Sequence, residues 1–486
     1  MTPHDAQLLA LEAATRRRFL CDSGVSLGGV ALAALLGGST RASASGGLAE
    51  DAKPQLHFAP RAKSVIFIHL AGAPPQHDLF DLKPALDRYN GQACPDEYLK
   101  GEKFAFIKGH PTLLASPFKF HKHGKCGMEL SELIPGVASI ADEITLLRGV
   151  KTDQFNHAPA QLLMHTGEAR FGHPSMGAWL SYGLGSTRAQ LPSFVVLVSG
   201  DKTPDAGKSV WGSGFLPGQF QGVQCRTVGE TVLYLDDPSG TTRTSRRAAL
   251  DAMRDLNMLS PFADANTRAR VEQFEMAYRM QMSVPEATDL ASETPETLAL
   301  YGATPGAASF ANNCLLARRL VERGTRFVQL FDWGWDAHGT GESDDLLHQL
   351  PKKCLETDRP SAALVLDLKR RGLLDETLVI WGGEFGRTPM AEYRNGVKAF
   401  IGRDHHPHCF SMWMAGGGVK KGLVHGATDE LGYFATEGVV EVRDLQATIL
   451  ALLGFDHERL TYRHAGLDQR LTGVTKPSRV VTEIIA

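Results

Sequence analysis

Short apolar runs that alternate with helical patterns are the feature that most limits how this chain can fold. Two helical patterns, Ala311–Arg323 and Ser361–Arg371, each end before a glycine and lead into an apolar run. Continuous apolar strands that alternate with helices predict an α/β fold with three layers, in which helices cover both faces of a mostly parallel sheet. The six apolar runs are Ser64–Leu70, Ile144–Leu147, Phe194–Val198, Arg326–Phe331, Thr377–Trp381 and Phe410–Met414.

The pattern changes between about residue 200 and residue 305. Gly- and Pro-containing sequence leads there into two charged amphipathic stretches, Thr241–Met258 and Ala265–Met282. We interpret residues 200–305 as a helical cap or insertion on the same domain.

The N-terminal segment has the order of an export signal rather than of a folded element. Arg16 and Arg17 precede Phe19-Leu20, and an apolar run from Val25 to Leu36 is followed by Ala42-Ser43-Ala44. Paired arginines in this context resemble a twin-arginine signal. We therefore expect residues 1–44 to be a removable signal and residues 45–486 to form one large domain in the periplasm or outside the cell. The apolar run is shorter than the ~20 residues that span a bilayer, so no integral membrane span is expected after removal of the signal.

Composition narrows the function classes. The chain has 51 basic and 54 acidic residues, a net charge of -3, and no basic stripe, which argues against a nucleic-acid partner. Six cysteines remain beyond the signal, and an oxidising compartment would allow disulfides whose pairing the sequence does not define. No Cys-x-x-Cys occurs, which argues against a zinc ribbon or a thioredoxin-type motif. Cys314 lies in a helical pattern and is expected to be buried and free.

Loops that follow the predicted strands carry metal-type ligands. Ligands of parallel α/β sheets bind outside the carboxyl ends of the strands, where these loops meet. Carboxylate oxygen and imidazole nitrogen together suit Zn²⁺, Mn²⁺ or Fe, and additional carboxylates permit Mg²⁺ or Ca²⁺, so the identity of the divalent metal stays open. Any one pair could instead be a hydrogen-bonded loop. The predicted ligands are Asp78, Asp336, His338, Glu384, Asp404 and His405, with His406 in reserve.

Other histidines and two arginines have different expected roles. His69 and His165 lie inside apolar patterns and are predicted to be core residues, and His121 is expected to be solvated. Hydrolysis of a phosphate or sulfate ester develops negative charge that a metal ion can neutralise. Arg387 or Arg403 could hold the ester oxyanion through two parallel hydrogen bonds.

The chain also resembles a known family, the bacterial secreted family named domain of unknown function 1501, placed in the alkaline phosphatase and sulfatase superfamily. The resemblance runs from about residue 60 to the C-terminus and implies an alkaline phosphatase-like fold with metal ligands on the strand-end loops. The matching stretches are FIHLAGAPPQHDLFDLKP, FNHAPAQLLMHTG, HPSMGAWLSYGLGS, WDAHG, GGEFGRTP, GRDHHPH and DLQATILALLGFDHERLTYRHAGLDQRLTGV.

Two of these stretches resemble sulfatase signatures in detail. DETLVIWGGEFG is similar to a strand that ends in Ser-Asp-His or Ser-Asp-Asn, which implies that Glu384 is the acidic metal ligand. FNHAPAQLLMHTG resembles Cys-x-Pro-Ser-Arg followed by Thr-Gly, which implies that His157 occupies the nucleophile position and Gln161 replaces the arginine. The Cys or Ser that becomes formylglycine is absent.

Three nucleophiles are therefore open. Ser175 at a predicted helix start could attack, although the same residue fits a helix N-cap. His157 could attack directly, or a metal-activated water could replace a protein nucleophile.

The sequence thus predicts an exported, metal-dependent hydrolase for small-molecule or polysaccharide phosphate or sulfate esters. The alternative is a non-catalytic secreted protein that contains metal and binds sulfated or phosphorylated polysaccharide. A structural envelope protein is a third interpretation.

Overall fold

The computed structural model describes residues 54–185, 191–199, 203–226, 242–259, 284–393 and 399–486, together with residues 271, 274, 275 and 278. One compact unit spans Lys53–Ala486. The export signal predicted for residues 1–44 and most of the second helix predicted for the insertion lie outside the described residues. Helix α7 (Arg243–Leu259) coincides with the first predicted helix of that insertion, and the division into signal, domain and cap stays a prediction.

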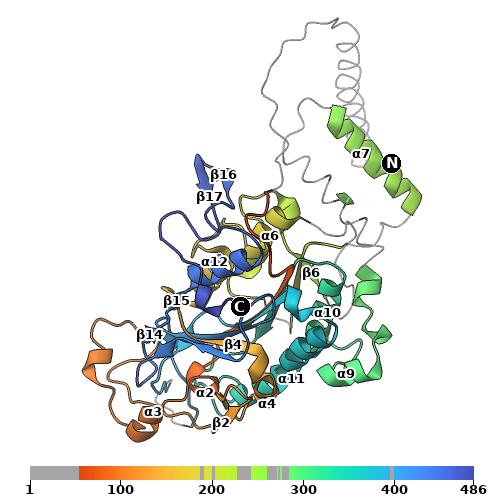
Figure 1. Ribbon diagram of the computed structural model, residues 1–486. Coiled ribbons are helices and arrows are strands. Elements are labelled where there is room, and N and C mark those ends of the chain that lie inside the picture. The colour runs from red at the N-terminus through yellow and green to blue at the C-terminus, as the bar shows by residue number, and fades with distance from the viewer. Residues whose placement is uncertain are drawn as a thin grey trace, which may run out of the picture. The chain divides into compact units, whose positions relative to one another are not determined.

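A nine-stranded sheet forms the centre of the described chain (Figure 1). Its strands follow the order β12-β4-β11-β8-β1-β7-β5-β6, and β15 also pairs with β4. Only β11 among them runs antiparallel to its neighbours, so the prediction of a mostly parallel sheet is confirmed, and all six predicted runs lie in it. The strands are β1 (Ser64–Ala71), β4 (Ile144–Lys151), β5 (Phe194–Val198), β6 (Val223–Cys225), β7 (Phe327–Trp333), β8 (Thr377–Gly382), β11 (Phe410–Ala415), β12 (Leu423–His425) and β15 (Val440–Glu441).

Helices cover both faces of this sheet, as predicted. Figure 1 shows α6 and α12 on one side and α4, α10 and α11 on the other. Strand β1 is buried throughout because alternate residues enter two different cores: Ile66 and Ile68 pack with α10 and α11, and Val65 and Phe67 pack with α5, α6 and α12. Besides α7, the described helices include α2 (Gln76–Leu79), α3 (Pro84–Tyr89), α4 (Pro135–Ser139), α5 (His157–Thr166), α6 (Met176–Leu184), α9 (Pro295–Tyr301), α10 (Phe310–Glu322), α11 (Gln349–Arg370) and α12 (Val442–Leu452).

Helix α11 begins earlier than the sequence pattern predicts. The pattern places the helix at Ser361–Arg371, but the structure extends it back to Gln349, through Pro360. An internal proline costs roughly 3 kcal/mol. Burial of Leu350 and Cys354 in the core offsets that cost and keeps the first half helical.

Four two-stranded sheets complete the described strands, and one of them joins the loops that carry predicted ligands. In that sheet His405 pairs with Arg387 and His406 with Gly386. The pairs are β2 (Phe120–His123) with β3 (Met128–Ser131), β9 (Gly386–Arg387) with β10 (His405–His406), β13 (Ala427–Thr428) with β14 (Ala435–Glu437), and β16 (Tyr462–His464) with β17 (Leu467–Gln469).

The six cysteines beyond the predicted signal are all free thiols, and Cys314 is buried as expected. None of the helices in the described part of the chain has the length and apolar character needed to cross a membrane.

Candidate metal centre

Four side chains converge at the carboxyl edge of the sheet. They are His157 at the start of α5, Asp336 and His338 in the loop after β7, and His405 in β10. Their ligand atoms all lie within 4.8 Å of one another. Asp336 Oδ1 is 2.8 Å from Nε2 of His338 and 3.3 Å from Nε2 of both His157 and His405. Three imidazoles therefore direct the same ring nitrogen at one carboxylate oxygen.

The other nitrogen of each imidazole is held by an acceptor from outside the cluster. Carbonyl and carboxylate oxygens only accept, so each Nδ1 carries the hydrogen. The Nε2 lone pairs are thereby left facing the centre when the rings are neutral, which is the arrangement of metal-binding histidines. The three contacts are His157 to Glu384 Oε1 at 2.7 Å, His338 to Glu392 Oε2 at 2.6 Å, and His405 to the backbone oxygen of Phe155 at 2.7 Å.

The donor set fits a divalent metal ion. Nε2 of His338 lies 3.0 Å from Nε2 of His405, and two lone pairs at that distance repel each other unless a cation lies near them. Nε2 of His157 is buried and has no hydrogen-bond partner. Three imidazole nitrogens and one carboxylate oxygen suit a tetrahedral Zn²⁺ site, and the same ligands accept Mn²⁺ or Fe.

The charges at the centre favour the ligand-competent forms of His405 and Asp336 but the protonated form of His157. Burial lowers the pKa of His405 to about 4, so this ring is neutral near pH 7. Burial acts to raise the pKa of Asp336, but the Arg387 guanidinium and the three histidines hold it well below its usual range. Burial also opposes protonation of His157, yet its contacts with the Asp336 and Glu384 carboxylates raise its pKa to about 9. A metal ion would therefore displace a proton from His157 on binding.

Glu384, a predicted ligand, lies behind His157 instead of at the centre. It is fully buried, and its Oε1 accepts from Gly72 N and Gln161 Nε2, both at 3.1 Å, as well as from His157. With three donors on that oxygen, the structure shows Glu384 as the group that orients His157.

Arg387, predicted to hold an ester oxyanion, is also fully buried. Its guanidinium donates to Asp336 Oδ1 at 2.5 Å, to Ala73 O at 3.1 Å and to Arg403 O at 3.0 Å, and it also bonds Gly72 O. These bonds fix Asp336 within the cluster, whereas a contact with substrate stays a prediction.

Asp404 lies beside the cluster and belongs with His338 and Glu392 to a second group of potential ligands. Its Oδ2 accepts from Phe106 N at 2.8 Å and Ile107 N at 2.9 Å. The Phe106 ring lies 4.7 Å from that of His338, so Asp404 anchors an aromatic cover over the imidazoles.

The structure does not bring Asp78 or His406 into either group of potential ligands. Both oxygens of Asp78 are engaged by the buried Arg403, at 2.7 and 3.1 Å. His406 Nε2 lies 2.5 Å from Tyr433 O, and burial lowers its pKa to about 3, so it is a neutral core residue. A strong local partner explains why each side chain is held away from the centre.

Ser175, a predicted nucleophile, is the N-cap of α6. It is fully buried and its Oγ accepts from Ala178 N at 3.3 Å. We expect Ser175→Ala to lower the free energy of unfolding by about 1 kcal/mol, the usual cost of a lost N-cap, and to leave metal affinity unchanged. Denaturant unfolding and metal titration would measure both, and loss of ester turnover with a retained fold would instead identify Ser175 as the nucleophile.

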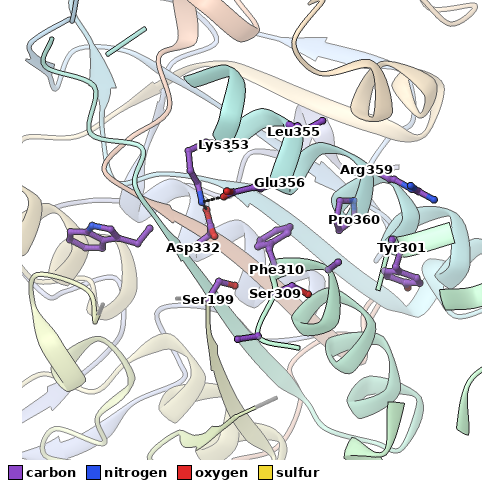
Figure 2. Close-up of a pocket in the computed structure, with 14 residues that line it drawn as sticks. Ser199, Tyr301, Ser309, Phe310, Asp332, Lys353, Leu355, Glu356, Arg359 and Pro360 are labelled. Carbon is purple, nitrogen blue, oxygen red and sulfur yellow. Dashed lines mark hydrogen bonds and ion pairs between the residues drawn. The ribbon is translucent and has the colours of Figure 1, made fainter. Parts of the chain in front are cut away.

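A cavity of about 750 Å³ lies near the loop after β7 that carries Asp336 and His338. It lies between α10, α11 and the ends of β5 and β7 (Figure 2). There Lys353 Nζ contacts Asp332 at 2.8 Å and Glu356 at 2.7 Å. Asp332 precedes Asp336 by only four residues, but its carboxylate is neutralised by Lys353 and lines this cavity. The metal-type ligands of the loop are thus confined to Asp336 and His338.

The fold and the site define a mixed α/β protein with a candidate histidine and aspartate metal centre at the carboxyl edge of its sheet. The family model described as "Protein of unknown function (DUF1501)" matches residues 62–485, so the chain belongs to that family. The sequence has no significant match among curated proteins.

Similar solved structures include members of three hydrolase groups. The PsFucS1 sulfatase from Pseudoalteromonas sp. is 13% identical, with a TM-score of 0.37 and coverage of 82% of this chain and 69% of that chain. The alkaline phosphatase from the Antarctic bacterium TAB5 is 10% identical, with a TM-score of 0.32 and coverage of 81% and 98%. The phosphonate monoester hydrolase SpPMH from Silicibacter pomeroyi is 13% identical, with a TM-score of 0.31 and coverage of 81% and 73%. At these TM-scores the likenesses do not define an activity for this chain.

Proposed function

We propose that this protein is an exported, metal-dependent hydrolase that acts on phosphate or sulfate esters. The observation that carries the proposal is the convergence of Nε2 of His157, His338 and His405 on Asp336 Oδ1. A divalent metal ion bound there would polarise an ester oxygen and lower the pKa of a bound water. The proposed location rests on the paired Arg16 and Arg17 before an apolar run.

The chain's own residues prepare this centre in three ways. Glu384 and Glu392 fix the orientation of two imidazoles, and Arg387 fixes Asp336. Phe385 lies 4.9 Å from the His157 ring, and this packing limits the access of water to that side of the centre.

The positions of His157 and Ser175 favour metal-activated water among the three candidate nucleophiles. His157 directs one nitrogen at the cluster and the other at Glu384, and Ser175 is buried as an N-cap. Neither side chain is placed to attack an ester as the structure stands. The ester class itself rests on the resemblance of FNHAPAQLLMHTG and DETLVIWGGEFG to sulfatase-type signatures.

The test is metal analysis of the folded protein followed by turnover. We expect about one tightly held Zn²⁺, Mn²⁺ or Fe per chain, since the described residues bring together one cluster of four potential ligands. With that metal, we expect hydrolysis of 4-nitrophenyl phosphate or 4-nitrophenyl sulfate that a chelator abolishes and added metal restores. A folded protein that binds none of these metals, nor Mg²⁺ or Ca²⁺, would contradict the proposal.

A second candidate function is non-catalytic binding of sulfated or phosphorylated polysaccharide. It is favoured by the residue at the nucleophile position, since His157 stands there instead of Cys or Ser. Metal binding without turnover of either aryl ester, combined with retention on immobilised dextran sulfate, would support this function over hydrolysis.

A further inference from the structure

Two buried histidines lie directly behind the metal centre. His69 in β1 and His165 in α5 have 0% and 1% of their surface exposed, and their ring centroids are 4.6 Å apart. The rings of Phe67 and Phe331 pack against them, so the surroundings are apolar. The sequence predicts both as core residues, but their contacts extend to the carboxylate that orients His157.

His69 is the group that faces the second oxygen of Glu384. Its Nε2 lies 3.2 Å from Glu384 Oε2 in a buried ion-pair contact, and neither atom has a partner at hydrogen-bond geometry. The first oxygen, Oε1, already accepts from three donors. A fully buried carboxylate oxygen without a donor costs about 1 to 3 kcal/mol or more, and His69, with its hydrogen on Nε2, is the side chain placed to donate to Oε2.

His165 has its ring orientation set by Gln329. Gln329 Nε2 lies 2.9 Å from His165 Nδ1 and also donates to Val210 O at 3.3 Å, which fixes the orientation of the amide. His165 Nδ1 therefore accepts, and the hydrogen of this ring is on Nε2. The His165 ring meets the His69 ring edge to face, at an interplanar angle of 65°, and so braces it.

We propose that His69, braced by His165, is a positioning residue of the metal centre that acts through Glu384 on His157. The proposal rests on the metal centre proposed above and deepens it. Gln329 donates to His165, whose ring packs against that of His69. His69 and His157 then direct their Nε2 and Nδ1 hydrogens at the two oxygens of Glu384. With Glu384 held from both sides, the Nε2 lone pair of His157 is fixed toward Asp336.

The experiment compares Co²⁺ affinity among variants of the metal-depleted protein, with the visible Co²⁺ absorption band as the spectroscopic signature. Leucine at position 69 removes the donor at similar volume, whereas glutamine places an amide nitrogen near the position of Nε2. We expect His69→Leu to weaken Co²⁺ binding by about 10- to 100-fold, the usual cost of losing a group that supports a ligand, and His69→Gln to restore most of it. His457→Leu is the matched control, because His457 is a buried histidine that contacts Thr472 and belongs to neither ligand group.

A double-mutant cycle separates positioning from packing. If His69 acts through the carboxylate, His69→Leu adds little to the loss already caused by Glu384→Gln. Additive losses, an unchanged Co²⁺ affinity in a folded His69→Leu protein, or equal losses in the leucine and glutamine variants would each overturn the proposal. If His69→Leu does not fold, His69→Gln and Glu384→Gln alone still test it, since Glu384→Gln must then weaken binding and His69→Gln must not. Wild-type protein that binds no metal would overturn the metal centre itself, which distinguishes the two failures.

Discussion

Replacing His338 with alanine is expected to abolish tight metal binding and, with it, any metal-dependent ester hydrolysis. His338 Nε2 lies 2.8 Å from Asp336 Oδ1 and 3.0 Å from His405 Nε2, so its ring is in contact with two other ligands. Its loss removes one of four ligands and leaves the buried Glu392 carboxylate without the Nδ1–H donor. The effect should exceed the about 10- to 100-fold that loss of an outer partner costs.

Thermal unfolding with and without added metal gives a readout that does not depend on activity. Wild-type protein should be stabilised by metal according to the ratio of metal concentration to dissociation constant, and His338→Ala should lose this shift. His121→Ala is the control, since His121 is an exposed histidine of β2. A His338→Ala protein that retains both the metal-dependent shift and turnover would exclude this cluster as the metal centre.

The fold was predictable because continuous apolar runs report burial on both faces of a sheet. The same reasoning selected the loops that carry Asp336, His338 and His405, since parallel strands bring their carboxyl ends together. Residue type and position after a predicted strand were enough to predict these three side chains as metal ligands.

Which of the candidate ligands face the metal centre, and which lie behind them, could not be predicted from residue type and strand order. Glu384 and His157 are both capable ligands by chemistry, and only the structure shows that Glu384 is fully buried at the end of β8, with His157 above it. The sequence therefore indicates the elements of the site but not which atom faces the centre. Asp78 illustrates the same limit, because its partner Arg403 is 325 residues away along the chain.

Two supporting groups had no usable signal in the sequence. The backbone oxygen of Phe155 holds His405, and a carbonyl has no residue-type signature. Glu392 follows no predicted strand, and it is positioned by an isolated bridge to Gly402. Such contacts depend on how the loops pack against each other.

Gly402 shows how tightly those loops pack, and Gly402→Ala is expected to disrupt the metal centre without altering a ligand. A Cβ at this position would lie 2.1 Å from the backbone carbon of His338 and 2.5 Å from Gly339 N. Real Cβ atoms essentially never approach other heavy atoms closer than 3.0 Å, so one loop must move. Because His338 is on one loop and His405 is three residues after Gly402 on the other, that movement separates two ligands. We expect a stability loss of about 1 to 3 kcal/mol, typical of overpacking, and a loss of metal affinity comparable to that of His338→Ala.

Gly341→Ala provides the matched control, because it makes the same substitution close to the His338 loop but a Cβ there meets nothing within 4 Å. Denaturant unfolding measures the stability of both variants, and Co²⁺ titration measures the centre. If the two glycine variants bind Co²⁺ equally, the loops have enough freedom to keep the ligands together, and close packing of Gly402 against His338 is not what holds the centre. If only Gly402→Ala loses Co²⁺ while remaining folded, contact between the loops sets the distance between His338 and His405, and the metal centre depends on backbone packing as much as on its four side chains.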